Sequence, residues 1–195
     1  MRYIRLTTVL LLAACGDSTT TPPTPVATSI TMSPTSVSLE ALGETTQLTA
    51  SVKDQSGATM SNAPVSWATS DAAVATVSTT ALVTSVADGS ATITATSGSA
   101  SGTVAVTVLQ EAAAVELSET TLALGSLGDT TQLSATVRDA AGTAVAGATV
   151  SWATSDTAVA TVSDAGLVTA ITNGTATITA SSASASGTVE VTVLQ

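Results

Sequence analysis

The sequence predicts an all-β protein made of two tandem β-sandwiches that follow a signal peptide and a disordered tether. Thr, Val, Ser and Ala dominate the chain, whereas good helix formers such as Glu, Lys, Gln and Arg are scarce. Residues 26–110 align without a gap with residues 111–195, and 49 of the 85 aligned positions are identical. Each copy consists of short alternating runs separated by turn residues, which is typical of a sandwich or barrel.

Three runs in the first copy alternate between apolar and polar residues. In residues 47–53, Leu48 and Val52 fall on one face, whereas the polar residues between them fall on the other. Residues 91–95 and 104–108 alternate in the same way, and each run has a counterpart in the second copy. We therefore expect each copy to contain strands that turn rows of Ala, Ile, Leu and Val toward a core.

Two dipeptides mark tight turns at the same place in each copy. Asp88-Gly89 and Asn173-Gly174 each lie between two predicted strands. Such dipeptides favour a type I′ hairpin, in which both central residues need positive φ. The sequence thus predicts that these four residues form turns, and it favours a turn role for Asp88 over that of a catalytic carboxylate.

The two tryptophans are the only aromatic residues beyond position 15, and they occupy equivalent positions. Trp67 lies in Val65-Ser-Trp-Ala-Thr-Ser-Asp71, and Trp152 lies in the same heptapeptide of the second copy. Exposed tryptophans could bind a carbohydrate or a cation. Burial is the favoured interpretation, since the predicted cores are otherwise poor in bulky side chains, and we expect both residues to be structural.

These segments resemble a known family. Leu42-Gly43, the tryptophan heptapeptide and Gly89-Ser-Ala-Thr-Ile-Thr-Ala95 are similar to the group 2 bacterial immunoglobulin-like domain of invasin- and intimin-type surface proteins. The resemblance implies an immunoglobulin-like sandwich of about seven strands in each copy, and it implies modules that commonly serve as stalks. Gly166 matches the family pattern before Leu167, whereas Ala81 departs from it, and we expect that departure to affect only a turn.

The N-terminus has the layout of a lipoprotein signal peptide. Residues 1–14 contain two arginines and then an apolar stretch that is too short to span a bilayer. Leu12-Ala-Ala-Cys15 resembles a lipobox, which implies cleavage before Cys15 and lipidation of its thiol. The alternative is an ordinary secretory peptide with an incidental cysteine. By the same resemblance Gly16 favours the outer membrane or cell surface over the inner membrane.

Charge and composition indicate how the rest of the chain is organised. Residues 15–25 carry three prolines and almost nothing apolar to bury, which predicts an extended tether before the domains at 26–110 and 111–195. Removal of the two arginines of the signal peptide leaves two cations against fourteen acids, a net charge near −12. That charge argues against nucleic acid and anionic membrane surfaces as partners, so the predicted membrane contact is the lipid anchor alone.

The residue types needed for catalysis or metal binding are scarce. The chain has no His and one Cys, so no general base is at hand to activate a serine. The aspartates form no D-x-D-x-D cluster that could fill a calcium sphere. The acids considered for this role are Asp54, Asp71, Asp88, Asp139, Asp156 and Asp164. We therefore predict no catalytic residue, no metal site and no cofactor, and we expect Asp71 and Asp156 to cap turns.

Two functions are compatible with this sequence. The favoured one is a lipid-anchored stalk or spacer in the cell envelope, because exposed aromatic residues suited to binding are absent. The alternative function is that of an adhesin that binds a protein or glycan through the distal copy. A third possibility is that the protein is a shortened descendant of a longer surface protein and has little independent role. Only Glu111-Ala-Ala-Ala114 separates the copies, so we expect them to lie end to end with few contacts.

Overall fold

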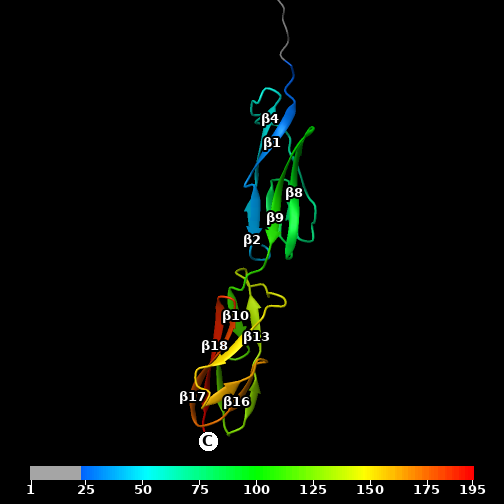
Figure 1. Ribbon diagram of the computed structural model, residues 1–195. Helices are drawn as coiled ribbons and strands as arrows, with labels where there is room; N and C mark the ends of the chain where they lie inside the picture. The colour runs from blue at the N-terminus through cyan, green and yellow to red at the C-terminus, as the bar shows by residue number, and fades with distance from the viewer. Residues whose placement is uncertain (1–22) are drawn as a thin grey trace, which may run out of the picture.

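Eighteen strands and no helix make up residues 23–195, the part of the chain that this computed structural model describes (Figure 1). The predicted signal peptide, Cys15 and most of the tether lie outside the described residues. Strands β1–β9 belong to module 1 (residues 26–110), and strands β10–β18 belong to module 2 (residues 111–195). The prediction of an all-β protein with two tandem sandwiches is confirmed.

The nine strands of each module occur in the same order, and all but the first and fourth have equivalent bounds. Module 1 contains β1 (Ala27–Ser33), β2 (Ser36–Leu39), β3 (Thr45–Gln47), β4 (Thr49–Asp54), β5 (Ser66–Thr69), β6 (Ala75–Val77), β7 (Leu82–Ser85), β8 (Gly89–Ser97) and β9 (Ala100–Val108). Module 2 contains β10 (Ala114–Leu117), β11 (Thr121–Leu124), β12 (Thr130–Gln132), β13 (Ala135–Arg138), β14 (Ser151–Thr154), β15 (Ala160–Val162), β16 (Leu167–Ala170), β17 (Gly174–Ser182) and β18 (Ala185–Val193).

Each module is a sandwich, and one of its two layers is a four-stranded sheet. In module 1 this sheet has the order β2-β9-β8-β5, and the other layer combines the three-stranded sheet β3-β7-β6 with the pair β1-β4. Module 2 repeats the arrangement with β11-β18-β17-β14, β12-β16-β15 and β10-β13. The long antiparallel pairs β8·β9 and β17·β18 run through nine residue pairs each and form the spine of their sandwiches.

The first strand of each module changes sheets partway along. In module 1, β1 pairs with β4 antiparallel, whereas β2 pairs with β9 parallel. Pro34 falls in the break between β1 and β2, where its missing N–H costs no ladder hydrogen bond. A second break at Leu48 separates β3 from β4. These interruptions account for nine short segments where the family resemblance implied about seven strands.

The core of each sandwich consists of the apolar side chains that alternate along the long strands. Ile93 and Ile178, at equivalent positions of the central strands β8 and β17, are fully buried, and valines of β9 and β18 pack with them. Aliphatic and alanine side chains fill almost all of this volume. Burial at about 25 cal/mol per Å² of apolar surface is what holds the layers together.

The two tryptophans lie at the edge of the sandwich and are half-buried, not enclosed at its centre. Trp67 is on β5 and Trp152 on β14, and both strands are edge strands of the four-stranded sheets. Their rings nevertheless pack against the cores. An edge strand has no neighbour on one flank, so part of each indole contacts solvent.

The prediction of type I′ hairpins at Asp88-Gly89 and Asn173-Gly174 is wrong. The strand before each dipeptide belongs to the three-stranded sheet and the strand after it to the four-stranded sheet, so the bend crosses between layers. Neither Asp88 nor Asn173 has positive φ. Glycine is needed for another reason: a Cβ built on Gly89 would lie 2.9 Å from Val74 Cγ2, and the φ of Gly89 is 146°.

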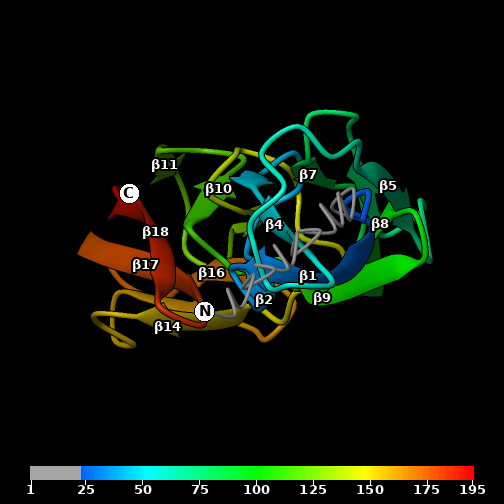
Figure 2. The same cartoon turned by 90° about the horizontal axis from the view of Figure 1, so that it is seen from above.

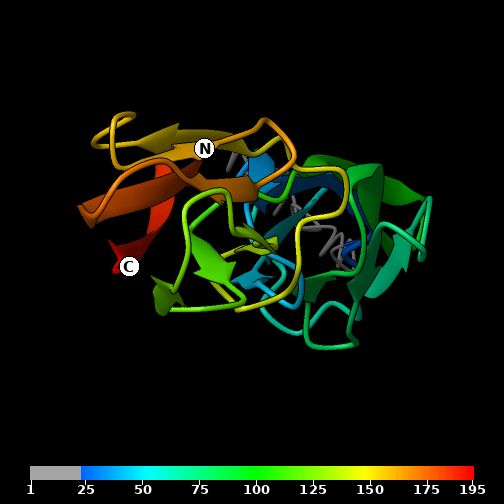
Figure 3. The same cartoon turned by 90° about the horizontal axis from the view of Figure 1, so that it is seen from below.

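The modules follow one another end to end, with residue 23 at one end of the molecule and the C-terminus at the other (Figure 1). The views along the long direction show the strands of module 2 displaced to one side of those of module 1 (Figures 2 and 3). Residues 23–195 contain no helix long and apolar enough to cross a membrane.

Candidate functional site: the joint between the modules

The segment between the modules is fixed by backbone hydrogen bonds on both sides. On the module 1 side, Leu109 N donates to Leu39 O over 3.0 Å and Glu111 N donates to Glu40 O over 2.9 Å. On the module 2 side, Ala113 N donates to Arg138 O over 2.8 Å. Every second residue from Leu109 to Ala113 is thus bound to one module or the other. A linker bound in this way is not a free hinge.

Asp88 contributes a side-chain contact to the same segment. Its Oδ1 accepts a hydrogen bond from Gln110 N over 2.8 Å, so the bend before β8 is tied to the first residue of the linker region. Sequence reasoning treated Asp88 only as a turn former. The structure places it, with Gly89, at the end of module 1 that faces module 2, whereas Asn173 and Gly174 lie at the equivalent far end of module 2.

Asp139 is the residue that joins the two modules most directly. It is 2% exposed, although it belongs to the loop between β13 and β14. Its Oδ1 accepts hydrogen bonds from its own loop, from Ala141 N at 3.0 Å and Thr143 N at 2.8 Å. Its Oδ2 accepts from Leu42 N of module 1 at 3.0 Å and from the Gln110 side chain at 2.9 Å. One carboxylate thus binds the loop, the linker and the preceding module together.

Hydrogen bonds determine the direction in which the pKa of the Asp139 carboxyl is shifted. Burial acts to raise the pKa of Asp139, but the donors from Gln110, Leu42, Thr143 and Ala141 outweigh it, so the pKa lies below the ordinary value of 3.8. A depressed pKa means that the native joint binds the ionised form more favourably. The contribution of Asp139 to the stability of the joint is therefore complete above pH 3.8, and it is lost as the pH falls through the lower pKa of the native state.

Asp54, the equivalent residue of module 1, shows what the loop does without a neighbouring module. Its Oδ1 accepts from Ser56 N at 2.8 Å, Ser56 Oγ at 2.6 Å and Ala58 N at 2.9 Å, so it caps its own loop as Asp139 does. These hydrogen bonds lower the pKa of Asp54. Within residues 23–195, Asp54 Oδ2 has no hydrogen-bond partner. The inter-module contact is therefore added to a loop that each module builds for itself.

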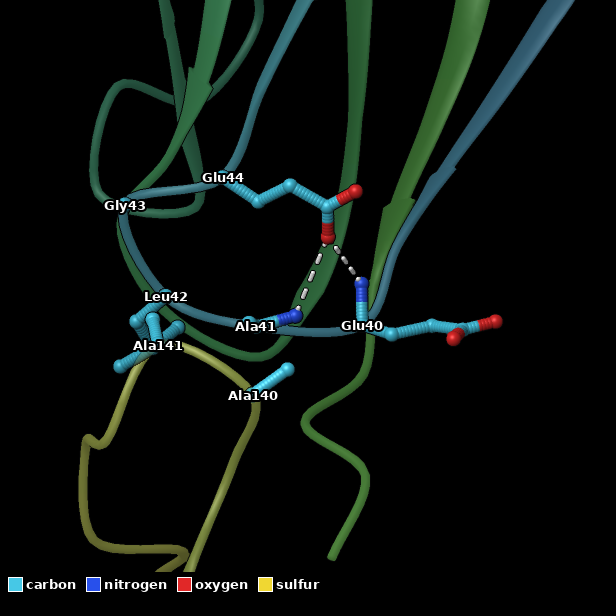
Figure 4. Close-up of a pocket in the computed structure, with 7 residues that line it drawn as sticks. All are labelled: Glu40, Ala41, Leu42, Gly43, Glu44, Ala140 and Ala141. Carbon is cyan, nitrogen blue, oxygen red and sulfur yellow. Dashed lines mark hydrogen bonds between the residues drawn. The ribbon is translucent and has the colours of Figure 1, made fainter. Parts of the chain in front are cut away.

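A shallow cavity opens on one side of the joint. It has a volume of about 520 Å³, and Leu42 from module 1 and Ala141 from module 2 lie beside one another at its wall (Figure 4). Glu44 closes the loop above it, because its Oε2 accepts hydrogen bonds from Glu40 N at 2.7 Å and Ala41 N at 3.2 Å (Figure 4). The contact between the modules is consequently small. Hydrogen bonds make up more of it than apolar packing does.

The structure keeps the remaining candidate acids apart. Asp71 Oδ1 accepts from Ala73 N and Asp156 Oδ1 accepts from Ala158 N, each at 2.9 Å, so both cap turns. Across the part of the chain that the structure describes, no three His, Cys, Asp or Glu side chains are placed to share a metal ion. The ion pair between Arg138 Nε and Glu116 Oε2, 2.7 Å apart, is exposed and contributes little to stability.

Similar solved structures come from surface proteins of several kinds. The S-layer protein rSbsC(31-844) is 20% identical over 87% of this chain, with a TM-score of 0.42, and this chain covers 28% of its length. The Escherichia coli adhesin FdeC is 18% identical over 89% of this chain and 66% of its own, with a TM-score of 0.47. Mouse cadherin-23 EC22-24 is 13% identical over 85% and 64%, with a TM-score of 0.37.

A family model gives a more specific match. No curated protein sequence matches the chain. The model of the bacterial Ig-like domain (group 2) matches twice in tandem, over residues 26–108 and residues 111–193. These two matches contain all eighteen strands of the two sandwiches. The chain therefore belongs to the group 2 bacterial Ig-like domain family.

Proposed function

We propose that this protein is a lipid-anchored component of the bacterial cell envelope whose two Ig-like modules form a non-catalytic spacer. The observation that carries the spacer is the joint: a linker hydrogen-bonded to both modules and a buried Asp139 that receives donors from module 1 and from the linker. Such a joint keeps two modules in line. A chain made only to tether a ligand-binding domain would need no fixed angle.

The anchor is supported by the sequence before module 1. Residues 6–14 are mostly apolar, and small residues precede Cys15, as in a lipobox. Acyl chains contribute about 0.8 kcal/mol per buried methylene, so more than one chain gives stable attachment. The tether that follows, with Pro22, Pro23 and Pro25, favours an extended polyproline conformation that would hold module 1 away from the lipid.

Replacing the cysteine tests the anchor. We expect Cys15→Ala to abolish incorporation of labelled palmitate and to release the chain from the membrane fraction, because no other thiol exists to carry the lipid. The measurement is metabolic labelling followed by fractionation. A Cys15→Ala protein that stays in the membrane fraction at the wild-type level would contradict lipid anchoring.

Replacing Asp139 tests the spacer. We expect Asp139→Asn to loosen the angle between the modules, because the amide turns one acceptor oxygen into a donor that faces Leu42 N and Gln110 Nε2. Small-angle X-ray scattering of the lipid-free Cys15→Ser chain should then fit an ensemble of inter-module angles in place of one rod with a fixed angle. For the unmodified Asp139, lowering the pH well below 3.8 should have the same effect.

Asp54→Asn is the matched control. It removes the same carboxylate from the same kind of loop, but no module contacts Asp54 within the described residues, so the scattering profile should not change. If Asp139→Asn and wild type gave superimposable profiles, the joint would not depend on this carboxylate and the spacer would lose its main support.

A further inference from the structure

The joint is formed by one loop from each module, and each of these two loops has an equivalent in the other module. The half contributed by module 1 is the loop around Leu42. The equivalent loop of module 2 contains Leu127 and follows Leu124, which pairs with Val193 near the C-terminus at the distal end of the molecule (Figure 1). The half contributed by module 2 is the Asp139 loop, whose equivalent in module 1 is the Asp54 loop. The joint thus pairs two surfaces, and the distal tip presents one of them again.

The tip loop is already folded in the conformation that docks at the joint. Gly128 N donates to Ala170 O over 2.9 Å, as Gly43 N donates to Ser85 O over 3.1 Å in module 1. The carboxylate of Asp129 accepts from Ser126 N at 2.9 Å, which is the role that Glu44 has in module 1. No rearrangement is needed to make this surface available.

The groups that the joint covers are uncovered at the tip. Ala41 is 5% exposed and Leu42 is half-buried, whereas Leu127 is 47% exposed and Ser126 is exposed. At the joint, Leu42 N donates to an aspartate of the next module. In residues 23–195 the equivalent N–H of Leu127 makes no hydrogen bond. The tip therefore presents an apolar side chain beside a backbone donor that lacks an acceptor.

The matching acceptor has a definite chemistry. It is an aspartate in a hairpin loop whose Oδ1 caps that loop and whose Oδ2 is left for another chain, with a small side chain two residues further on. Asp54 and Ser56 of module 1 have this arrangement, and Asp139 and Ala141 use it at the joint. Both modules of this protein carry such a loop, so the matching acceptor is a loop of an Ig-like module similar to these two.

We propose that the distal tip of module 2 is a docking surface for the aspartate-bearing hairpin loop of an Ig-like module of another chain. Leu127 N donates to the free carboxylate oxygen, and the Leu127 side chain lies against the small residue of the loop, as Leu42 lies against Ala141 (Figure 4). The lipid anchor proposed above would hold the Asp54 loop of each copy toward its own membrane. The natural partner is consequently a module of a different protein.

In the experiment, the Asp54 loop of the lipid-free chain takes the place of the partner's loop. In a Cys15→Ser background, a chain carrying Leu127→Cys is mixed with a chain carrying Ser56→Cys under mild oxidation. Docking should make the mixed disulfide dimer form at least several-fold faster than the dimers that each chain forms with itself. Asp54→Asn on the Ser56→Cys chain should remove most of this excess, whereas Asp71→Asn, in a different turn, should leave it unchanged.

A chain with both Leu42→Cys and Ala141→Cys gives the internal reference. These positions lie beside one another at the joint, so this pair should close within the chain at all protein concentrations. If this pair closes and the mixed dimer forms no faster than the self-dimers, the tip does not dock such a loop. If this pair fails to close, the joint geometry is wrong and the proposal falls with it. Neither result bears on the lipid anchor, and a negative result for the mixed dimer alone leaves the Asp139 experiment unaffected.

Discussion

Trp152→Ala is expected to lower the free energy of unfolding of module 2 by about 3 kcal/mol, the lower end of the range for removing a tryptophan from a core. The lower end applies because the Trp152 ring is half-buried at the edge of the sheet. The ring nevertheless packs against two apolar clusters of module 2, and the other side chains there are mostly Ala, Val and Leu, which cannot fill the space.

Urea unfolding followed by circular dichroism measures this loss. The second tryptophan supplies the control, because in Trp152→Ala the fluorescence of Trp67 reports on module 1 alone, whose transition should keep its midpoint. Trp67→Ala should have the reciprocal effect. A variant whose module 2 unfolds at the wild-type urea concentration would show that the indole is a surface group and not part of the core.

Gly166→Ala is expected to destabilise module 2 by about 2–4 kcal/mol, through backbone strain and overlap together. Gly166 has a φ of 83°, a region that costs a residue with a Cβ. A Cβ built there would lie 2.7 Å from Leu133 O and 2.9 Å from Trp152 Cζ2. The Leu133 oxygen is part of the backbone and cannot move without disturbing the strand pairing beside it.

Module 1 provides the reciprocal experiment. Ala81 occupies the position of Gly166 with a φ of 66° and is 5% exposed, so module 1 already contains the strained residue. Ala81→Gly should relieve that strain and raise the urea midpoint of module 1, by about 1 kcal/mol in free energy. If Gly166→Ala were neutral and Ala81→Gly destabilising, the glycine would be an incidental difference between the copies.

Period-two alternation predicted the strands well because burial acts on one face at a time. Leu48 and Val52 are buried, as their alternation indicated, and the runs around Ile93 and Val106 form the two central strands of module 1. The duplication then carried each prediction to the second copy. These features follow from local pattern and from a core that every sandwich must bury.

The partners of the strands were not visible in the sequence. Asp88-Gly89 has the composition of a tight hairpin, yet the strands on either side of it lie in different layers, because pairing is decided by the whole sandwich. The sequence predicts buried tryptophans, whereas both lie on edge strands and are half-buried. The alternation of apolar and polar residues indicates which face of a strand is buried, but it does not indicate whether the strand is central or at the edge of its sheet.

The role of Asp139 could not be predicted for a related reason. Asp54 and Asp139 have the same place in their loops and cap them through similar hydrogen bonds. The main difference lies beyond the loop: among residues 23–195 no second module faces Asp54, whereas module 1 faces Asp139. A comparison of the two copies could have marked the position, because only the second loop follows another module along the chain.

The parallel pairing of β2 with β9, and of β11 with β18, has a mechanical consequence. A load applied between the two ends of the molecule pulls the first and last strands of each module in opposite directions along their own length. The four residue pairs of each parallel contact are then sheared together, and no single pair at an end can be peeled away first. Resistance to stretching is thus built into the strand order of both sandwiches.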